Sequence, residues 1–125
     1  MVKRVIPNIR SGNPADGQEF YTDVLGLEVV MDMGWIVTFG SPENPTAQLT
    51  VVDSDPALPH PDYSVEVADV DACYRRAQEQ GWDIVHPLTV EPWGVRRFFV
   101  RDPTTRLPMS CSTRTANKND VLCHI

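Results

Sequence analysis

Apolar residues change their spacing along this chain in a way that predicts a repeated order of strands and helices. Residues 3–10 alternate loosely between apolar and polar side chains, which is typical of a strand. A helix is predicted over residues 14–25, because Asn13 suits a helix N-cap and Pro14 suits the first helical position. Its apolar face comprises Gly17, Phe20, Tyr21 and Val24. Three predicted strands complete this first unit, at residues 27–33, 35–40 and 47–52.

The same order of elements begins again after a proline-rich segment at residues 53–61. A strand is predicted at 63–67 and a helix over 69–80, with Asp69 as its N-cap and Gly81 as the residue that ends it. Three further strands are predicted at residues 82–86, 95–101 and 107–113. The apolar helix faces of the two halves are 53 residues apart, so the chain repeats a βαβββ pattern.

Two βαβββ units predict an α+β fold built from curved mixed β-sheets. Each helix must bury its apolar face, so one helix is expected on the outside of each unit. The inner faces of the sheets then enclose a cleft that suits a small molecule. We expect one domain over residues 1–113, with unit one at about 4–53, unit two at about 62–113, and a C-terminal tail at 114–125.

Composition and charge narrow the class of protein. The 125 residues carry a net charge of -6, which argues against non-specific binding to nucleic acid or to anionic membranes. No apolar run approaches the roughly 18 residues that a membrane span needs. The cysteines are Cys73, Cys111 and Cys123, an odd number without CxxC spacing, so a disulfide framework or zinc ribbon is not expected. These features predict a soluble protein of the reducing cytoplasm.

Three short motifs connect this pattern with a known family. They read Phe20-Tyr21-x-x-Val24-Leu25-Gly26-Leu27, then Val67-x-Asp69-Val70-Asp71-Ala72, then Pro92-Trp93-Gly94-x-Arg96-x-Phe98-x-x-x-Asp102-Pro103. In this order they resemble the vicinal oxygen chelate superfamily of glyoxalases, bleomycin-resistance proteins and extradiol dioxygenases. The resemblance covers about residues 4–113, is nearest to the bleomycin-resistance-like members, and implies the fold predicted above. It leaves the activity open, because this fold hosts isomerases, dioxygenases, thiol transferases and drug-binding proteins.

The resemblance also implies where a divalent metal would be held. Enzymes of the family use three or four inward His, Glu or Gln side chains. The matching positions here are Ile6, Gln48, Asp62 and Met109, with Asn8 as the next inward residue of the first strand. Two apolar residues among four positions leave too few ligands for a cation. We therefore expect no metal and no other cofactor.

Aromatic and polar residues supply the remaining candidates for the cleft. Trp35 and Phe39 share one face of a predicted strand and Trp93 lies in a loop, so they could stack on a flat ligand or pack in the core. Arg96 and Arg97 point to opposite sheet faces, so one of them could face the cleft. The predicted ligand-binding set is Asn8, Trp35, Phe39, Gln48, Asp62, Trp93, Arg96 and Met109.

Other chemistry-bearing residues have simpler interpretations. His60 and His86 each lie beside proline in a predicted loop, where exposed histidines are common. Glu66 and Glu91 have no visible partner in the sequence and are interpreted as solvated carboxylates. No Ser-His-Asp, P-loop or GxGxxG pattern is present.

Three hypotheses follow for function. The first, which the missing ligands favour, is a metal-free homodimer of the bleomycin-resistance type that binds a small molecule, such as an antibiotic. The carboxylate of Asp62 would then favour a cationic ligand. The second is a metal-dependent enzyme of the glyoxalase or dioxygenase type with a divergent site. The third is a metal-free enzyme that uses Asp62 or Glu91 as its base.

Overall fold

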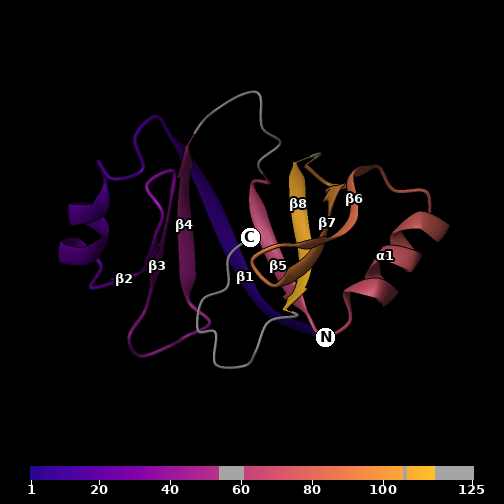
Figure 1. Ribbon diagram of the computed structural model, residues 1–125, viewed down its shortest axis with the longest axis horizontal. Coiled ribbons are helices and arrows are strands. Elements are labelled where there is room, and N and C mark those ends of the chain that lie inside the picture. The colour runs from indigo at the N-terminus through magenta and orange to yellow at the C-terminus, as the bar shows by residue number, and fades with distance from the viewer. Residues whose placement is uncertain (54–60, 106, 115–125) are drawn as a thin grey trace.

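Eight strands form one continuous mixed sheet in the computed structural model, which describes residues 1–53, 61–105 and 107–114 (Figure 1). In chain order, the elements are β1 (Val2–Ser11), η1 (Phe20–Val24), β2 (Glu28–Asp32), β3 (Ile36–Gly40), β4 (Gln48–Asp53), β5 (Tyr63–Val67), α1 (Val70–Glu79), β6 (Ile84–Glu91), β7 (Val95–Arg101) and β8 (Pro108–Arg114). This order is the repeated βαβββ pattern, so the predicted α+β fold class is confirmed. The predicted tail at 114–125 lies outside the described residues except for Arg114, which is the last residue of β8.

The two units join edge to edge through their first strands. The strand order is β2-β3-β4-β1-β5-β8-β7-β6. Within each unit the first strand pairs in parallel with the last, and β1 and β5 pair antiparallel between the units. Arg4 lies opposite Glu66 and Ile6 lies opposite Ser64 in this central pairing. The sheet therefore places side chains from both units next to one another on its inner face.

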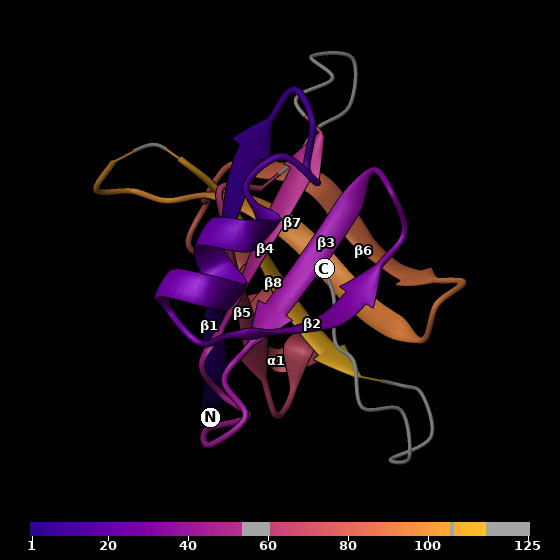
Figure 2. The same cartoon turned by 90° about the vertical axis from the view of Figure 1, so that its left-hand side faces the viewer.

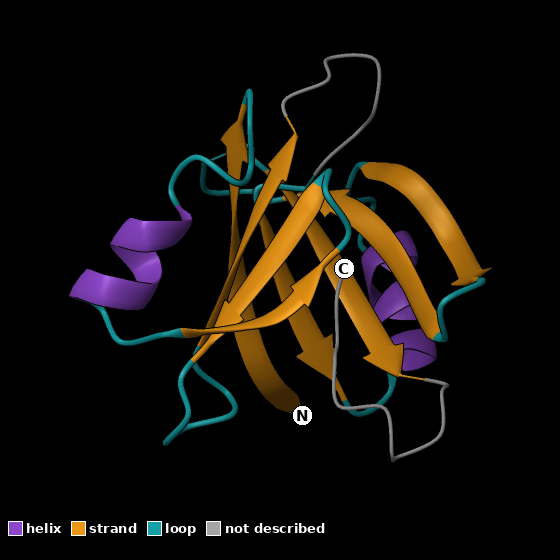
Figure 3. Cartoon of the chain, turned by 60° about the vertical axis from the view of Figure 1, so that its left-hand side comes forward, coloured by secondary structure: helices purple, strands orange, loops and turns teal. Residues whose placement is uncertain are grey.

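The helices cover the outer face of the sheet, one on each side of the molecule (Figure 3). Helix α1 packs on β6, β7 and β8. Its N-cap is Asp69, whose carboxylate accepts a hydrogen bond from the Ala72 amide at 3.1 Å, as predicted. Gly81 follows the helix with φ of +75°, a left-handed conformation that glycine adopts without a steric penalty. Among the described residues, no helix has the length and apolar character to cross a bilayer.

The first helix is shorter than the sequence predicts. Residues 14–17 form turns, and the helix that follows is mainly the π-helical segment Phe20–Val24, which lies beside the strands of the first unit (Figure 2). A π-helix has more residues per turn, so positions spaced for one α-helical face no longer point the same way. Tyr21 packs on Phe39 with 4.9 Å between ring centroids, whereas Phe20 is 56% exposed. Tertiary contact with Tyr21 thus holds a segment whose local preferences for an α-helix are weak.

Two apolar cores lie between the helices and the outer face of the sheet. The first-unit core contains Val37, Phe39 and Val51, with Tyr21, Leu27 and Leu49 packed against it. The second-unit core contains Val67, Val70, Phe98 and Cys111, with further residues of α1 and β8 packed against it. The two clusters that face the helices are therefore apolar, whereas the inner face combines buried polar residues with apolar ones such as Ile6, Ile36 and Phe99.

The predicted turn after Asp102 is organised by the Asp102 carboxylate. Its Oδ1 accepts hydrogen bonds from the amides of Thr104 and Thr105 at 2.6 and 2.9 Å. Its Oδ2 accepts a hydrogen bond of 2.6 Å from the hydroxyl of Tyr63 in β5. The Tyr63 hydrogen bond, followed by the two amides, lowers the pKa of Asp102. Burial, together with the carboxylate, raises the pKa of Tyr63 to about 12.

Replacing Asp102 by asparagine should lower the pKa of Tyr63 toward that of a free tyrosine, because the neighbouring negative charge is removed. Ultraviolet titration of the phenols measures this change. The raised folded-state value means that Tyr63 stabilises the fold below its unfolded pKa, and this stability is lost as pH rises toward about 12. Tyr63→Phe identifies the phenol, because it must remove the highest step of the titration. An unchanged titration in Asp102→Asn would contradict the assignment.

Candidate functional site

The inner face of the sheet is polar although much of it is buried. The buried polar residues of the described chain are Arg4, Asn8, Thr38, Thr50, Ser64, Ser110 and Ser112. The strand registers place them on one face, since Thr38 pairs with Thr50, Asn8 with Thr50 and Ser64 with Ser110. A core needs no such set of hydroxyl, amide and guanidinium groups, and burying them is costly unless they find partners. This face is therefore the candidate site.

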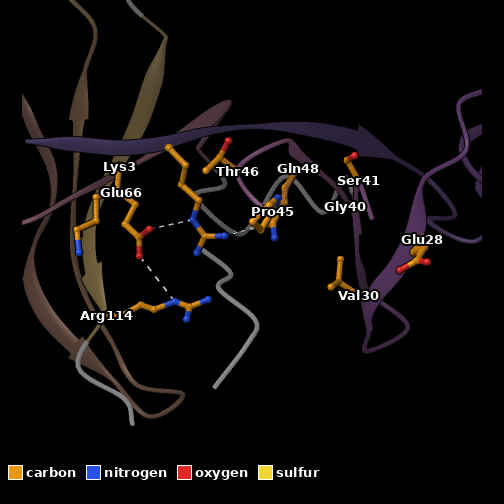
Figure 4. A pocket seen from close by; sticks show the side chains of 11 residues that line it. Lys3, Glu28, Val30, Gly40, Ser41, Pro45, Thr46, Gln48, Glu66 and Arg114 are labelled. Atoms are coloured by element: carbon orange, nitrogen blue, oxygen red, sulfur yellow. Dashed lines mark hydrogen bonds and ion pairs between the residues drawn. The ribbon is translucent and has the colours of Figure 1, made fainter. Parts of the chain in front are cut away.

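A cavity of about 440 Å³ opens on this face between the two units. Figure 4 shows Lys3, Glu66 and Arg114 on the second-unit side and Gln48 and Ser41 toward the first unit. The volume lies within the range of roughly 300–1,000 Å³ that is typical of small-molecule pockets.

Arg4 occupies the centre of this cavity wall with only 6% of its side chain exposed. Its Nε donates to Glu66 Oε1 at 3.0 Å and its Nη1 donates to Gln48 Oε1 at 2.7 Å. The second oxygen of Glu66 lies 3.7 Å from Arg114 Nε. The Arg4 Nη2 atom is buried and has no hydrogen-bond partner among the described residues. Three elements of both units thus converge on a single guanidinium group.

Burial and charge act on this guanidinium in opposite directions. Burial lowers the pKa of Arg4, the negative charge of Glu66 raises it, and the nearby positive charge of Arg114 lowers it. Arginine has so high an ordinary pKa that it stays protonated in proteins. The cavity wall therefore holds a buried positive charge that, among the described residues, one carboxylate contacts directly.

The positions that face one another at the sheet centre do not form a metal site. Ile6 is opposite Ser64, which is opposite Ser110. Asn8 of β1 pairs in parallel with Thr50 of β4. Ile6 and Gln48 each lie two residues before these, so Gln48 lies beside Ile6 in the same inner row. An isoleucine, an amide and two neutral hydroxyls offer no carboxylate, imidazole or thiolate, so this donor set does not fit a divalent metal. Among the residues that the structure describes, no cluster of three or more His, Cys, Asp or Glu could hold one.

Two residues matched to metal positions in the second unit lie elsewhere. Met109 faces outward and packs with the α1 core, so its placement in the cleft is wrong. The inner residue of β8 is its neighbour Ser110, because successive side chains of a strand point to opposite faces. Asp62 precedes β5, lies 3.9 Å from Arg10, and does not line the cavity. The second unit therefore contributes Ser64 and Ser110 where Asp62 and Met109 were expected.

The aromatic residues of β3 also face away from the cleft. Phe39 is fully buried in the outer core of the first unit, so its predicted ligand contact is wrong. Trp35 directly precedes β3, is 46% exposed, and does not line the cavity. The inward positions of β3 are Ile36, Thr38 and Gly40, which alternate with the outer ones. The alternative interpretation, core packing against the helix, is the correct one for Phe39.

The two adjacent arginines of β7 separate to opposite faces, as predicted. Arg96 faces α1 and donates to Asp71 at 2.7 Å, so its assignment to the cleft is wrong. Arg97 is the inner residue, since it pairs with Ser112 of β8. Its Nε donates to Glu91 Oε1 at 3.2 Å.

A second polar cluster surrounds Arg97. Its guanidinium lies 5.1 Å from the ring centroid of Trp93 and 4.7 Å from that of Phe99. Glu91 also contacts His86, whose Nε2 is 3.2 Å from Glu91 Oε1. Glu91 and His86 were interpreted as solvated, and that interpretation is wrong for both.

Of the predicted set, Asn8 and Gln48 do lie on the inner face. Asn8 is buried and its amide donates to Ser64 Oγ at 3.0 Å and to the Pro61 carbonyl at 3.1 Å. Gln48 lines the cavity and holds Arg4. The sequence reasoning missed Arg4 and Glu66, which the central pairing places opposite each other. The sequence could have indicated Arg4, because it lies two residues before Ile6 and four before Asn8 and so points to the same face of the strand.

Comparison with protein families identifies the chain. The family model described as the glyoxalase/bleomycin resistance protein/dioxygenase superfamily matches residues 5–105. The chain belongs to this superfamily. The resemblance to the vicinal oxygen chelate group is therefore confirmed, and so is a glyoxalase-like fold. No curated protein sequence matches the chain.

Solved structures of the superfamily share this fold at low sequence identity. A glyoxalase/bleomycin resistance protein/dioxygenase superfamily member from Vibrio splendidus is 19% identical, with a TM-score of 0.70 over 90% of this chain and 99% of that one. A methylmalonyl-CoA epimerase variant from Streptomyces coelicolor is 16% identical, with a TM-score of 0.68 over 93% of this chain and 100% of that one. The methylmalonyl-CoA epimerase from Mycobacterium tuberculosis is 18% identical, with a TM-score of 0.65 over 97% of this chain and 91% of that one. At these identities the likeness shows the fold alone.

Proposed function

We propose that this superfamily member is a metal-independent small-molecule binding protein of the cytoplasm, with the Arg4 cavity as its ligand site. The observation that carries the proposal is the inner row of Ile6, Gln48, Ser64 and Ser110, which lacks the donors of a metal centre. Beside this row the cavity presents a buried guanidinium group instead. In this proposal the cavity holds its ligand through hydrogen-bond donors and needs no metal.

The carboxylates of the inner face form ion pairs with neighbouring side chains, which supports a binding function over metal-free catalysis. Both oxygens of Glu66 face guanidinium groups, one from Arg4 and one from Arg114. Of the two bases that the metal-free enzyme hypothesis names, Glu91 is engaged by Arg97 and His86, and Asp62 lies 3.9 Å from Arg10. A general base must reach the proton that it removes from a ligand. These ion pairs occupy oxygens of Glu66 and Glu91 that a base would need for a ligand proton.

The expected homodimer remains part of the proposal, and an exposed apolar surface on β1 supports it. Both units of one chain line the cavity, so the cavity needs no partner chain to complete it. Apolar side chains are exposed on the outer side of β1 at Val5 and Ile9. Self-association through such a surface would bury them without altering the cavity.

Ligand binding should be independent of divalent metal. We expect a panel of small organic molecules to include compounds that raise the melting temperature equally in chelator and in added metal, since a ligand at 100 times its Kd adds about 2.7 kcal/mol. Nuclear magnetic resonance with paramagnetic Mn²⁺ should leave the amide signals of Gln48, Ser64 and Ser110 unbroadened. Stoichiometric metal that broadens these signals and is required for binding would overturn the proposal.

A substitution that fills the cavity locates the bound molecule. A Cβ at Gly40 would lie 3.1 Å from Val30 Cγ2 and 3.6 Å from Gln48 Cγ, so Gly40→Val should block the ligand. Gly12→Val is the matched control, because a Cβ at Gly12 would meet no atom within 4 Å. Binding that survives Gly40→Val unchanged would place the ligand elsewhere.

A further inference from the structure

The buried Nη2 of Arg4 indicates what part of a ligand the cavity recognises. This atom carries two N–H donors, has no hydrogen-bond partner among the described residues, and belongs to a side chain that is more than nine-tenths buried. A buried charged donor without an acceptor costs free energy that a suitable ligand atom would recover. The cavity therefore favours a ligand that presents an acceptor at this point.

Gln48 supplies a second donor to the lining of the same cavity. Its Oε1 accepts from Arg4 Nη1, so its Nε2 is directed away from the guanidinium group. Nε2 lies 3.8 Å from the place that a Cβ on Gly40 would take, and Gly40 also lines the cavity. It donates to no other residue that the structure describes. Both residues line the same cavity, so one carboxylate could take a charged donor from Arg4 and a neutral donor from Gln48.

The charge of the cavity lining fixes the charge of that ligand. Lys3, Arg4 and Arg114 carry positive charge, and Glu28 and Glu66 carry negative charge. One positive charge is left over, in a chain whose net charge is -6. A single negative charge on the ligand balances this excess, whereas a doubly charged phosphate would exceed it. The expectation that Asp62 selects a cationic ligand is wrong for this cavity, which Asp62 does not line.

We propose that the cavity binds a small organic monocarboxylate, with its oxygens on Arg4 Nη2 and Gln48 Nε2. The rest of the ligand lies against Val30, Gly40 and Pro45, which form the less polar part of the lining. This inference rests on the proposed binding function and names the ligand class for the same site.

The experiment compares probes that differ only in charge. Hexanoate, hexanamide, hexylamine and inorganic phosphate are titrated into the protein by nuclear magnetic resonance. Hexanoate should bind at least roughly tenfold more tightly than hexanamide, because hydrogen bonds to charged groups are the stronger kind. Hexylamine and phosphate should bind more weakly than hexanoate. Equal binding of hexanoate and hexanamide, or tighter binding of phosphate, overturns the carboxylate inference and leaves small-molecule binding intact.

Variants assign the effect to Arg4. Arg4→Gln should weaken hexanoate binding at least roughly tenfold and leave hexanamide binding within about twofold. Arg10→Gln is the matched control, because it removes the same charge from the same strand outside the cavity and should bind hexanoate as the parent does. Equal losses in both variants would overturn the assignment. If no probe binds the parent protein, the carboxylate inference fails, whereas the proposed function fails only if the wider panel of small molecules also shows no binding.

A direct measurement on the parent protein covers the case in which Arg4→Gln does not fold. The Nε–Hε signal of Arg4 is identified by its absence from the spectrum of Arg4→Lys. It should shift on addition of hexanoate and stay in place with hexanamide. A signal that ignores hexanoate while other signals shift would overturn the inference.

Discussion

Replacing Glu66 by alanine is expected to lower the free energy of unfolding by about 3 kcal/mol, at the lower end of the range for breaking a buried ion pair. Glu66 is the carboxylate that contacts the Arg4 guanidinium directly, and the side chains are only 13% and 6% exposed. Its removal leaves Arg4 and Arg114 facing each other without a negative charge between them. Urea unfolding measures the effect as a lower midpoint with an unchanged slope.

A double variant separates the buried charge from the loss of packing. Arg4→Met combined with Glu66→Leu removes both charges and keeps most of the volume, so it should recover most of the stability lost in Glu66→Ala. It should also lose hexanoate binding, because the donor at Nη2 is gone. If Glu66→Ala unfolds at the parent's urea concentration, water reaches the pair freely and the guanidinium group is not buried in solution.

Local spacing was enough to predict most of the fold. Asp69 caps the start of helix α1, and Gly81 follows its end with a positive φ. Both effects depend only on residues within one helical turn, so the sequence alone predicts them. The first helix differs because its form depends on a distant contact, the packing of Tyr21 on Phe39. Such a contact between a helix and a strand is fixed by tertiary structure and overrides propensity.

The site was harder to predict because a strand has a period of two. A shift of one residue moves a side chain to the other face of the sheet, which is the difference between Met109 and Ser110. Apolar residues such as Phe39 and Met109 were assigned to the cleft, yet they face the helices. In this sheet the helix-covered outer face holds the two apolar clusters, and the inner face holds the buried polar residues of the same strands together with apolar ones such as Ile6 and Phe99.

This division explains why Asn8 and Gln48 were placed on the correct face. Both were assigned to the cleft through the family resemblance, and both are polar residues on strands whose apolar neighbours, such as Ile9 and Leu49, point to the outer face. Arg4 obeys the same alternation, but a buried arginine is expected only where a partner is available. That partner, Glu66, is 62 residues away in the sequence and becomes adjacent only through the pairing of β1 with β5.

Replacing Phe98 by alanine is expected to destabilise the protein by about 3–5 kcal/mol, because a buried ring is exchanged for a cavity. Phe98 is 2% exposed and belongs to the outer core of the second unit, where Tyr74 of α1 meets its ring edge-on at a centroid distance of 5.0 Å. A domain is stable by only about 5–15 kcal/mol, so the change should be visible as a large fall in the urea midpoint.

The location of Phe98 on the outer face also predicts what its removal leaves unchanged. Below the new unfolding midpoint, Phe98→Ala should bind hexanoate as the parent does, because the ring does not line the Arg4 cavity. Phe20→Ala is the matched control, since Phe20 is exposed on η1 and its loss should change stability by no more than about 0.5 kcal/mol. A loss of affinity in folded Phe98→Ala with normal affinity in Phe20→Ala would mean that the outer core and the cavity are coupled through β7 and β8. Equal stability losses in both phenylalanine variants would contradict the position of the core itself.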